Sequence, residues 1–171
     1  MNLSRNVGIV LLIIINITID QISKVIVRSN IRLRTDIDRG ERINVIGDEF
    51  IMMNVENTGA FLGMGSDMSD TFRIIFLLIL PTLVLAYLIY YIIVNKTLDK
   101  LSTIALSCIA GGGIANVFDR IAFGKVTDFF YIDLGGVFKT GIFNVADMSV
   151  TFGMLVLIYT WFISSKRKQI A

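Results

Sequence analysis

The sequence lacks histidine altogether and contains one proline and one cysteine in 171 residues. Without histidine the chain cannot build a Ser-His-Asp triad, a Cys-His pair or a histidine-ligated metal centre, so its chemistry must use carboxylates, lysine or hydroxyls. The lone Cys108 can form no internal disulfide, and its apolar neighbours indicate a packing residue. With no low-complexity stretch to suggest a linker, we expect a single domain over residues 1–171.

Charge is also scarce. Only 18% of the residues are charged, whereas 54% are apolar and the mean hydropathy is +0.73, which is too apolar for an ordinary soluble domain. We therefore expect an integral membrane protein. The net charge of +2 comes from basic residues that form no stripe with interleaved aromatics, so nucleic acid is excluded as a partner.

Four apolar runs are long enough to cross a bilayer as helices, and we expect them at about 7–27, 72–94, 101–121 and 145–163. Pro81 falls in the second run, where a bundled membrane helix tolerates proline. The third run contains Gly111–Gly113 and Ala115, a small surface that allows close helix approach. The predicted fold class is an all-α polytopic membrane protein with four transmembrane helices and a small extracytoplasmic β-element.

The short basic segments predict the orientation of these helices. Lys96 and Lys100 lie between the second and third runs, and a basic cluster at 166–168 follows the fourth, so this connection and the C-terminus should be cytoplasmic. With four spans, the N-terminus should then be cytoplasmic too. The segment after the first run is then outside. Its middle, residues 43–58, is rich in Ile, Val, Phe and Met, which predicts a strand-bearing element within 28–66 on the outer membrane surface.

Polar residues gather at the outer ends of the predicted helices. Ionisable residues within spans cost about 2.5–3.5 kcal/mol each on insertion scales, so a cluster of them suggests a functional site. The cluster comprises Asp20 and Lys24 at the end of the first helix, Asn116, Asp119 and Arg120 at the end of the third, Asn144 and Asp147 at the start of the fourth, and Asp128 in a loop after the third.

Several of these residues have structural explanations. Asp20 and Lys24 are spaced i, i+4, which favours an ion pair that closes the outer end of the bundle. Asn116 and Asp119 share a helix face with Arg120, which can donate either to loop carbonyls or to Asp119, so this group resembles scaffolding beside a site.

Asn57 stands in the stretch "ENTGAF" and allows two interpretations. Its side chain can support the turn that Gly59 permits, or its amide can bind an extended peptide or a lipid headgroup. The sequence favours neither.

Asp128 and Asp147 differ because neither has a basic residue at i+3 or i+4. Asn144 can cap the fourth helix and leave Asp147 in its first turn, where the helix dipole favours an anion. Asp128 lies among aromatic residues, where desolvation favours the protonated acid. One ionised and one neutral carboxyl would suit an aspartic hydrolase. The alternative is that one acid caps a helix and the other pairs with Lys125 or Lys139.

The chain resembles the bacterial lipoprotein signal peptidase family, also called signal peptidase II. Five blocks carry the resemblance in the family's order: "DQISK" (20–24), "NTGA" (57–60), "GGGIANVFDR" (111–120), "VTDF" (126–129) and "FNVAD" (143–147). The resemblance implies a membrane-embedded aspartic endopeptidase of the bacterial inner membrane that cuts prolipoproteins just before a diacylglyceryl-modified cysteine, with its active site near the outer leaflet. It implies no metal and no cofactor, and the expected partners are the prolipoprotein and membrane lipid. We expect a monomer.

The resemblance also assigns roles to residues. It implies that Asp128 and Asp147 are the catalytic pair, and that substrate binding or site support comes from Asp20, Lys24, Asn57, Gly59, Asn116, Asp119, Arg120, Asn144 and Ala146. The chain departs from the family's usual residues at Phe61, Ala115 and Met148, which affects the expected pocket shape and leaves both carboxylates in place. Asp133 matches no motif, and we expect a solvated loop residue there.

Two other hypotheses remain at this point. A small transporter or ion-binding bundle would need polar residues along the spans toward the cytoplasm, and the second run is nearly all apolar. A non-catalytic membrane scaffold would use the glycine-rich third helix for packing and would leave the convergence of Asp128 and Asp147 unexplained.

Overall fold

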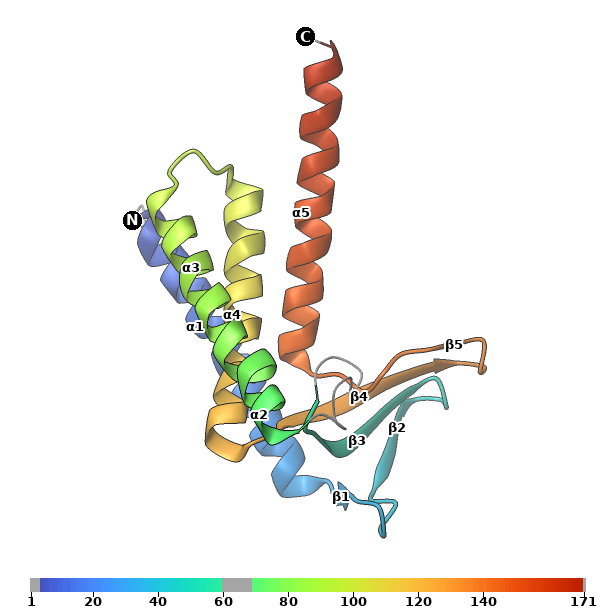
Figure 1. The fold of residues 1–171 in the computed structure, drawn as a ribbon. Helices are drawn as coiled ribbons and strands as arrows, with labels where there is room; N and C mark the ends of the chain where they lie inside the picture. Colours follow the sequence, from blue (N-terminus) through green and yellow to red (C-terminus); the bar gives the residue numbers. More distant parts are fainter. Residues whose placement is uncertain (1–3, 60–68, 171) are drawn as a thin grey trace.

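The computed structural model describes residues 4–59 and 69–170, the last five of these by backbone alone. Within these ranges, four helical segments are long and apolar enough to span a membrane: Arg5–Asn30, Asp70–Val94, Lys100–Phe123 and Val145–Ser165. A five-stranded sheet lies at one end of the helices, and the N-terminus, the C-terminus and the connection after residue 94 lie at the other (Figure 1). The predicted fold class is confirmed.

The second span is not a uniform α-helix. It consists of α2 (Asp70–Arg73), a π-helical stretch η2 (Ile74–Ile79) and α3 (Leu80–Val94). Pro81 is the second residue of α3 and has no N–H to donate, so the regular hydrogen-bond pattern cannot continue through it. The hydroxyl of Thr82 donates to the carbonyl of Leu78 at 2.6 Å and satisfies one acceptor of this region. The helix therefore accommodates the proline as expected.

The central helix of the bundle is α4 (Lys100–Phe123), which contacts α1 (Arg5–Asn30), α3 and α5 (Val145–Ile170). Asp99 caps its first turn by accepting the N–H of Ser102 at 2.9 Å. Its last turn ends at Gly124, whose φ of +71° is the left-handed conformation that glycine adopts without strain. Helix α5 runs beside α4 and extends beyond the other helices (Figure 1).

Three consecutive glycines of α4 face three different helices. A Cβ added at Gly111 would lie 2.7 Å from Asn16 of α1, one at Gly112 would lie 2.4 Å from the carbonyl oxygen of Ala146 in α5, and one at Gly113 would lie 2.6 Å from Leu85 of α3. Real Cβ atoms do not approach other atoms so closely. The small surface predicted from the sequence therefore lets all three neighbouring helices pack against the backbone of α4.

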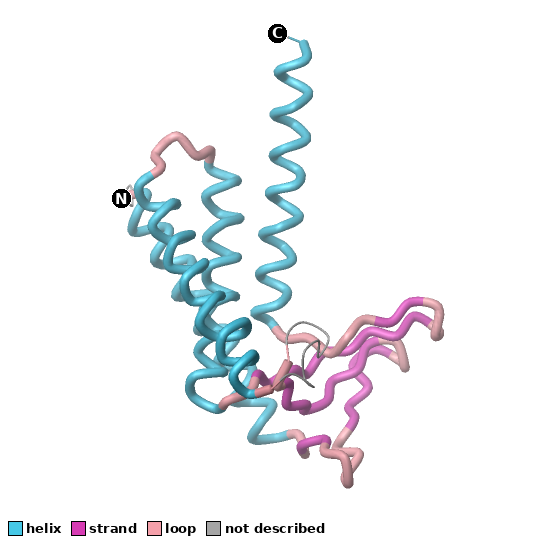
Figure 2. The backbone as a smooth tube through the Cα atoms, in the orientation of Figure 1, coloured by secondary structure: helices cyan, strands magenta, loops and turns pink. Residues whose placement is uncertain are grey.

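The sheet is built around two long antiparallel strands, β3 (Phe50–Asn57) and β4 (Val126–Leu134) (Figure 2). On the other side of β3, β1 (Leu33–Arg34) pairs in parallel and β2 (Arg42–Ile46) pairs antiparallel, while β5 (Phe138–Lys139) pairs with β4. The strand-bearing element expected within 28–66 is present as β1, β2 and β3, and residues 60–66 of that range lie outside the described residues.

The prediction that Asp128 lies in a loop is wrong, because it lies on β4. The strand begins with four consecutive buried residues, Val126–Phe129, so it lacks the alternation of apolar and polar residues that identifies a half-buried strand. Its partner β3 is also distant in the sequence, with Val55 opposite Asp128. Asp133 lies on the same strand and pairs with Lys139 at 3.2 Å, so it is not a free loop residue.

Two apolar clusters hold the helices together and join them to the sheet. The first consists of buried residues from α1, α3 and α4: Ile9, Ile13, Ile92 and Ala110. The second joins the end of α1 to the sheet through Val27, Ile31 and Phe129, with Val145 of α5 packed against it. The second cluster fixes the position of β4 relative to the outer ends of the helices.

The contact at Gly112 gives a direct test of this packing. Gly112→Ala should lower the free energy of unfolding by about 1–3 kcal/mol, because the added Cβ overlaps the backbone of α5. Gly8→Ala is the matched control, since a Cβ there has no other atom within 4 Å and alanine favours the helix. Thermal unfolding in detergent measures both. Equal midpoints for Gly112→Ala and wild type would contradict the close approach of α4 and α5.

Candidate active site

A buried lysine ammonium lies at the end of the helices that adjoins the sheet. Lys24 of α1 is fully buried and donates to Asp20 at 2.7 Å, to Asp119 at 2.8 Å and to the side-chain oxygen of Asn116 at 2.9 Å. These three acceptors use all three donors of the ammonium group. The ion pair expected between Asp20 and Lys24 is present, and Asp119 of α4 is a second carboxylate partner.

The two carboxylates around Lys24 connect further elements. The other oxygen of Asp20 accepts the backbone N–H of Ala146 at 2.8 Å, which links α1 to the first turn of α5. Gln21 donates at 2.9 Å to the carboxylate oxygen of Asp119 that Lys24 does not bind. Gln21 was not among the predicted site residues, although it is a polar residue at the sheet end of a span and falls within the "DQISK" block.

Asn144 and Asp147 form a reciprocal cap at the start of α5. The side-chain oxygen of Asn144 accepts the N–H of Asp147 at 2.9 Å, and Asp147 accepts the N–H of Asn144 at 3.1 Å. The other carboxylate oxygen of Asp147 accepts the amide of Asn116 at 2.9 Å. The predicted capping arrangement is confirmed, and Asn116 connects Lys24 directly to Asp147.

Asp128 approaches this cap from the sheet and is 3% exposed. One of its oxygens accepts the side-chain amide of Asn144 at 2.6 Å, and the other accepts that of Asn57 at 2.8 Å. Asn144 therefore binds both aspartates, Asp147 through its backbone N–H and Asp128 through its side chain. The alternative of a lysine partner for Asp128 is wrong, because Lys125 pairs with Glu56 and Lys139 pairs with Asp133.

Asn57 supports the turn, which is the first of the two functions that the sequence left open, and it also contacts Asp128, which the sequence did not predict. Its side-chain oxygen accepts the N–H of Gly59 at 2.8 Å, while its amide binds Asp128. Arg120 of α4 donates to the carbonyl of Gly59 at 2.8 Å, so it binds a loop carbonyl as predicted. The turn after β3 is thus fixed to α4, and Phe61 lies outside the described residues.

The site contains more carboxyl groups than cations. Asp20, Asp119, Asp128 and Asp147 lie around Lys24 and Arg120, so full ionisation would leave excess negative charge in a buried space. Burial raises the pKa of Asp128 to about 6, and the charge of Asp147 adds to this effect, whereas the amides of Asn57 and Asn144 oppose it.

Asp133, on the same strand, shows the contrast. The N–H of Gly136 lowers the pKa of Asp133, because it binds the ionised carboxylate in an exposed position. The two acids of β4 therefore favour opposite protonation states. A carboxyl that keeps a proton near neutral pH beside a second carboxyl can act as one half of an acid–base pair.

A pocket of about 440 Å³ adjoins Asp147 on the side of α5. Its walls are mostly apolar and include Phe143, Met148, Phe152 and Leu155. Met148 stands where the family usually has serine, so it adds an apolar side chain to the pocket wall next to Asp147. Ala115, the second departure, is fully buried in α4. In the described part of the chain, no group of three or more His, Cys, Asp or Glu side chains is arranged so that it could hold a metal ion.

Comparisons with known proteins agree on one family. The model of the family described as signal peptidase (SPase) II matches residues 12–163. A lipoprotein signal peptidase of Borrelia hermsii (strain HS1 / DAH) is 34% identical and covers 97% of this chain and 98% of its own length, and one of Clostridium tetani (strain Massachusetts / E88) is 31% identical and covers 87% and 88%. A solved structure described as a bacterial membrane enzyme obtained by the in meso method is 25% identical, with a TM-score of 0.79 over 94% of this chain and 91% of that one.

Removal of the buried ammonium should destabilise the fold strongly. Lys24→Met leaves two carboxylates buried without their partner, and we expect a loss of about 3–5 kcal/mol in the free energy of unfolding. The matched control is Lys125→Met, which breaks a partly exposed pair with Glu56 and should cost at most about 1 kcal/mol. Denaturant unfolding in micelles compares the two. A similar small loss for both variants would show that Lys24 does not stabilise this network.

Protonation of Asp128 should make the fold's stability depend on pH. The pKa of Asp128 is about 6 in the folded protein, whereas the ordinary pKa of an aspartate is 3.8. Ionisation of Asp128 is therefore less favourable in the folded state than in the unfolded state. Stability should therefore be greatest below about pH 4 and decrease as the pH rises through about 6, by at most roughly 3 kcal/mol relative to Asp128→Asn. Unfolding of both proteins across this range measures the difference. A difference that is constant with pH would contradict the raised pKa.

Proposed function

The chain belongs to the signal peptidase II family, and from this premise we propose that it is an aspartic endopeptidase with Asp128 and Asp147 as its catalytic pair. It removes signal peptides from prolipoproteins and is a multi-pass protein of the bacterial inner membrane. The observation that carries the proposal is the position of Asn144, which binds Asp128 and Asp147 at once and so holds two carboxyls in one small site.

The proposed reaction is addition of water to the scissile carbonyl. One aspartate accepts a proton from water as the water oxygen bonds to the carbonyl carbon, and the other, protonated aspartate donates its proton to the carbonyl oxygen. The tetrahedral intermediate then collapses and the C–N bond breaks. The aspartate that took the proton from water donates it to the leaving nitrogen, and a hydroxyl of the intermediate returns a proton to the other aspartate as the new carboxyl group forms. Each oxygen of Asp128 and Asp147 already accepts one hydrogen bond from an asparagine, which fixes the carboxylates and leaves further lone pairs for water and substrate.

We further propose that cleavage occurs just before a diacylglyceryl-modified cysteine. The pocket beside Asp147 supports this choice, because its apolar lining on α5 would accept the hydrocarbon part of a substrate that arrives from the membrane. Arg120 and Asn57 fix the turn at Gly59, and Asn57 also binds Asp128, so the backbone at the end of β3 is held next to the pair.

The proposed orientation places both termini in the cytoplasm and the site near the outer leaflet. Lys96, Lys100 and the basic cluster at 166–168 belong to the end of the helices that lies away from the sheet, which agrees with the positive-inside rule (Figure 1). Such an arrangement presents the aspartates to a precursor whose signal peptide has crossed the membrane. We propose a monomer, because one chain contributes both carboxyls. The family assignment gives no support to the transporter or scaffold hypotheses.

Substitution of either aspartate should stop processing without preventing membrane insertion. Asp128→Asn and Asp147→Asn each remove one half of the acid–base pair, and we expect the processing rate to decrease at least roughly a thousandfold. A gel-shift assay of a diacylated prolipoprotein with membranes that contain each variant measures this rate. Asp133→Asn is the matched control on the same strand, since Asp133 pairs only with groups at the exposed edge of the sheet, and it should process normally.

An unmodified precursor serves as the substrate control and should remain uncut by all four proteins. Normal cleavage by Asp128→Asn or Asp147→Asn would overturn the catalytic assignment. Equal cleavage of modified and unmodified precursors would instead overturn the proposed requirement for the lipid and leave the catalytic pair intact.

A further inference from the structure

The sheet exposes large apolar side chains at the end of β4 that lies away from Asp128. Val137, in the turn between β4 and β5, is 96% exposed, and Phe138 of β5 is 58% exposed. Leu134, which pairs with Phe138, and Ile46 at the end of β2 are also exposed. We call Ile46, Leu134, Val137 and Phe138 the hairpin patch. The peptidase mechanism uses none of these residues, and a contiguous exposed apolar patch marks an interaction surface.

The strand residues of the patch share one face of the sheet. Residues that pair across neighbouring strands lie on the same face, and so do alternate residues along one strand. Ile46 pairs with Phe50, which pairs in turn with Ile132. Leu134 follows Ile132 by two positions along β4 and pairs with Phe138. The patch is therefore one surface that crosses the strands from β2 to β5.

This apolar face is turned toward the helices. Asp128 lies on the same face, because an even number of positions along β4 separates it from Leu134, and it accepts the amide of Asn144 at the start of α5. The opposite face is polar. It carries a recess of about 770 Å³ whose lining includes Arg42, Asn44, Asp133 and Lys139. The sheet is therefore amphipathic, with its polar face turned away from the helices.

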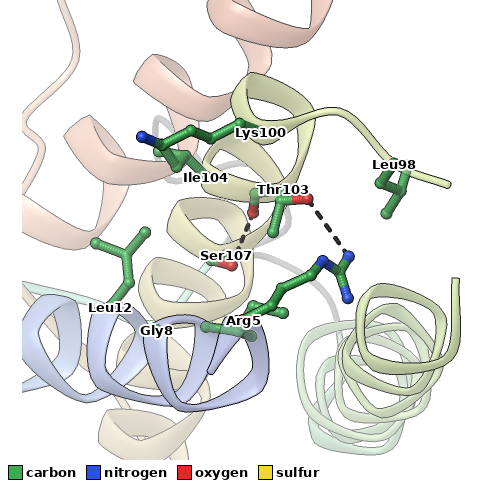
Figure 3. Close-up of a pocket in the computed structure, with 9 residues that line it drawn as sticks. Arg5, Gly8, Leu12, Leu98, Lys100, Thr103, Ile104 and Ser107 are labelled. Atoms are coloured by element: carbon green, nitrogen blue, oxygen red, sulfur yellow. Dashed lines mark hydrogen bonds between the residues drawn. The ribbon is translucent and has the colours of Figure 1, made fainter. Parts of the chain in front are cut away.

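Charged residues mark where the helices leave the hydrocarbon core of the membrane. At the end away from the sheet, Arg5 of α1 donates to the hydroxyl of Thr103 at 3.4 Å, and Lys100 lies one turn earlier on α4 (Figure 3). The next charged residues along α1 are Asp20 and Lys24, beside the sheet. From Arg5 to Lys24 the helix rises about 28 Å at about 1.5 Å per residue, which matches a hydrocarbon core of roughly 30 Å. Lys24 therefore marks the second boundary.

The hairpin of β4 and β5 lies at the level of this second boundary. Asn116 binds both Lys24 and Asp147, so the first turn of α5 is at the depth of Lys24. From there the hairpin runs out sideways, away from the other helices (Figure 1). The hairpin patch is therefore positioned along the surface of the hydrocarbon core.

The lipid-facing surface of α5 continues toward this hairpin. Helix α5 exposes Met148, Phe152 and Leu155 along one side, as a membrane helix does where it contacts lipid. Thr140 and Gly141, which follow β5 directly, line the same pocket as these three residues. The lipid that covers α5 therefore also reaches the chain segment that leads out of the hairpin.

We propose that the hairpin patch inserts into the membrane leaflet beside the site, which is the outer leaflet in the proposed orientation. Val137 and Phe138 enter the boundary between headgroups and acyl chains, and Leu134 and Ile46 lie along it. The polar face of the sheet stays in water. Amphipathic helices bury their apolar side about 5–10 Å into this boundary, and we expect a similar depth here. Because β4 carries both Leu134 and Asp128, insertion fixes the strand of the aspartate relative to the membrane surface. The inference is independent of the peptidase chemistry.

Fluorescence quenching by lipid tests the proposal in the full-length protein. Trp161 is the only tryptophan, so Trp161→Phe provides a background in which Val137→Trp is the single probe. The protein is reconstituted, without substrate, in dioleoylphosphatidylcholine vesicles that contain phosphatidylcholine brominated near the headgroup end of its chains. This lipid should quench Val137→Trp at least about twofold more than Ile37→Trp. Iodide in the water should show the opposite preference.

Ile37 is the matched control for Val137. It is 100% exposed, and it lies in the loop between β1 and β2, on the side of the sheet away from the helices (Figure 1). Equal quenching of the two probes by the brominated lipid would overturn the insertion.

A second pair of variants tests which face of the sheet meets the lipid. In the same background, Phe138→Trp should be quenched by the brominated lipid, and Lys139→Trp, one position along on the opposite face, should be quenched less. Thermal unfolding in detergent checks that each variant is folded. Equal quenching at both positions would contradict the sidedness. Shielding of Val137→Trp from iodide only when a precursor is added, or only at high protein density, would assign the patch to the precursor or to a second copy and overturn the membrane as its partner.

Discussion

The structure depends on one fully buried charge, the ammonium of Lys24. A buried cation is tolerated only when it is paired and hydrogen-bonded, and Lys24 obtains Asp20 from its own helix and Asp119 and Asn116 from α4. Asp20 in turn binds the first turn of α5. Three helices are therefore held in one relative position at the end next to the sheet, where Asp128 and Asp147 also lie.

The same network reaches both aspartates through two asparagines. Asn116 accepts a hydrogen bond from Lys24 and donates one to Asp147. Asn144 caps α5 and donates a hydrogen bond to Asp128, which lies on β4 of the sheet. Lys24 is thus two hydrogen bonds away from Asp147, through Asn116. It is three away from Asp128, because the amide of Asn144 donates both to Asn116, at 3.2 Å, and to Asp128. The close packing at Gly112 supports this arrangement, because it brings the first turn of α5 against α4. The side chains that stabilise the helix packing are therefore also the ones that hold the two proposed catalytic carboxyls.

Local patterns in the sequence predicted the parts of this architecture that depend on near neighbours. Hydropathy predicted the four spans, the i, i+4 spacing predicted the pair of Asp20 and Lys24, and the position of Asn144 predicted the cap. The strand β4 could not be predicted, because its buried start shows no alternation and its pairing partner is remote in the chain. For the same reason the contact between Asn57 and Asp128 could not be predicted from the residues alone. Asp119 bonds to Lys24 and Gln21 of another helix, and no local sequence pattern predicts such pairs. The predicted topology had already placed Asp128 and Asp147 at the same end of the helices, and the family resemblance assigned them to each other as a catalytic pair.

The central claim is that two carboxyls of unequal proton affinity perform the reaction. The most direct measurement is the pH dependence of kcat/KM for a diacylated prolipoprotein, with enzyme stability checked at each pH. Because one carboxyl must be ionised and the other protonated, the account predicts a bell-shaped profile, with the alkaline decline at or above about pH 6, where Asp128 loses its proton in the free enzyme. The two limbs belong to the pair as a unit, and each should disappear when either aspartate is replaced. A profile that is flat, or that rises continuously with pH, would contradict a shared proton and with it the aspartic mechanism.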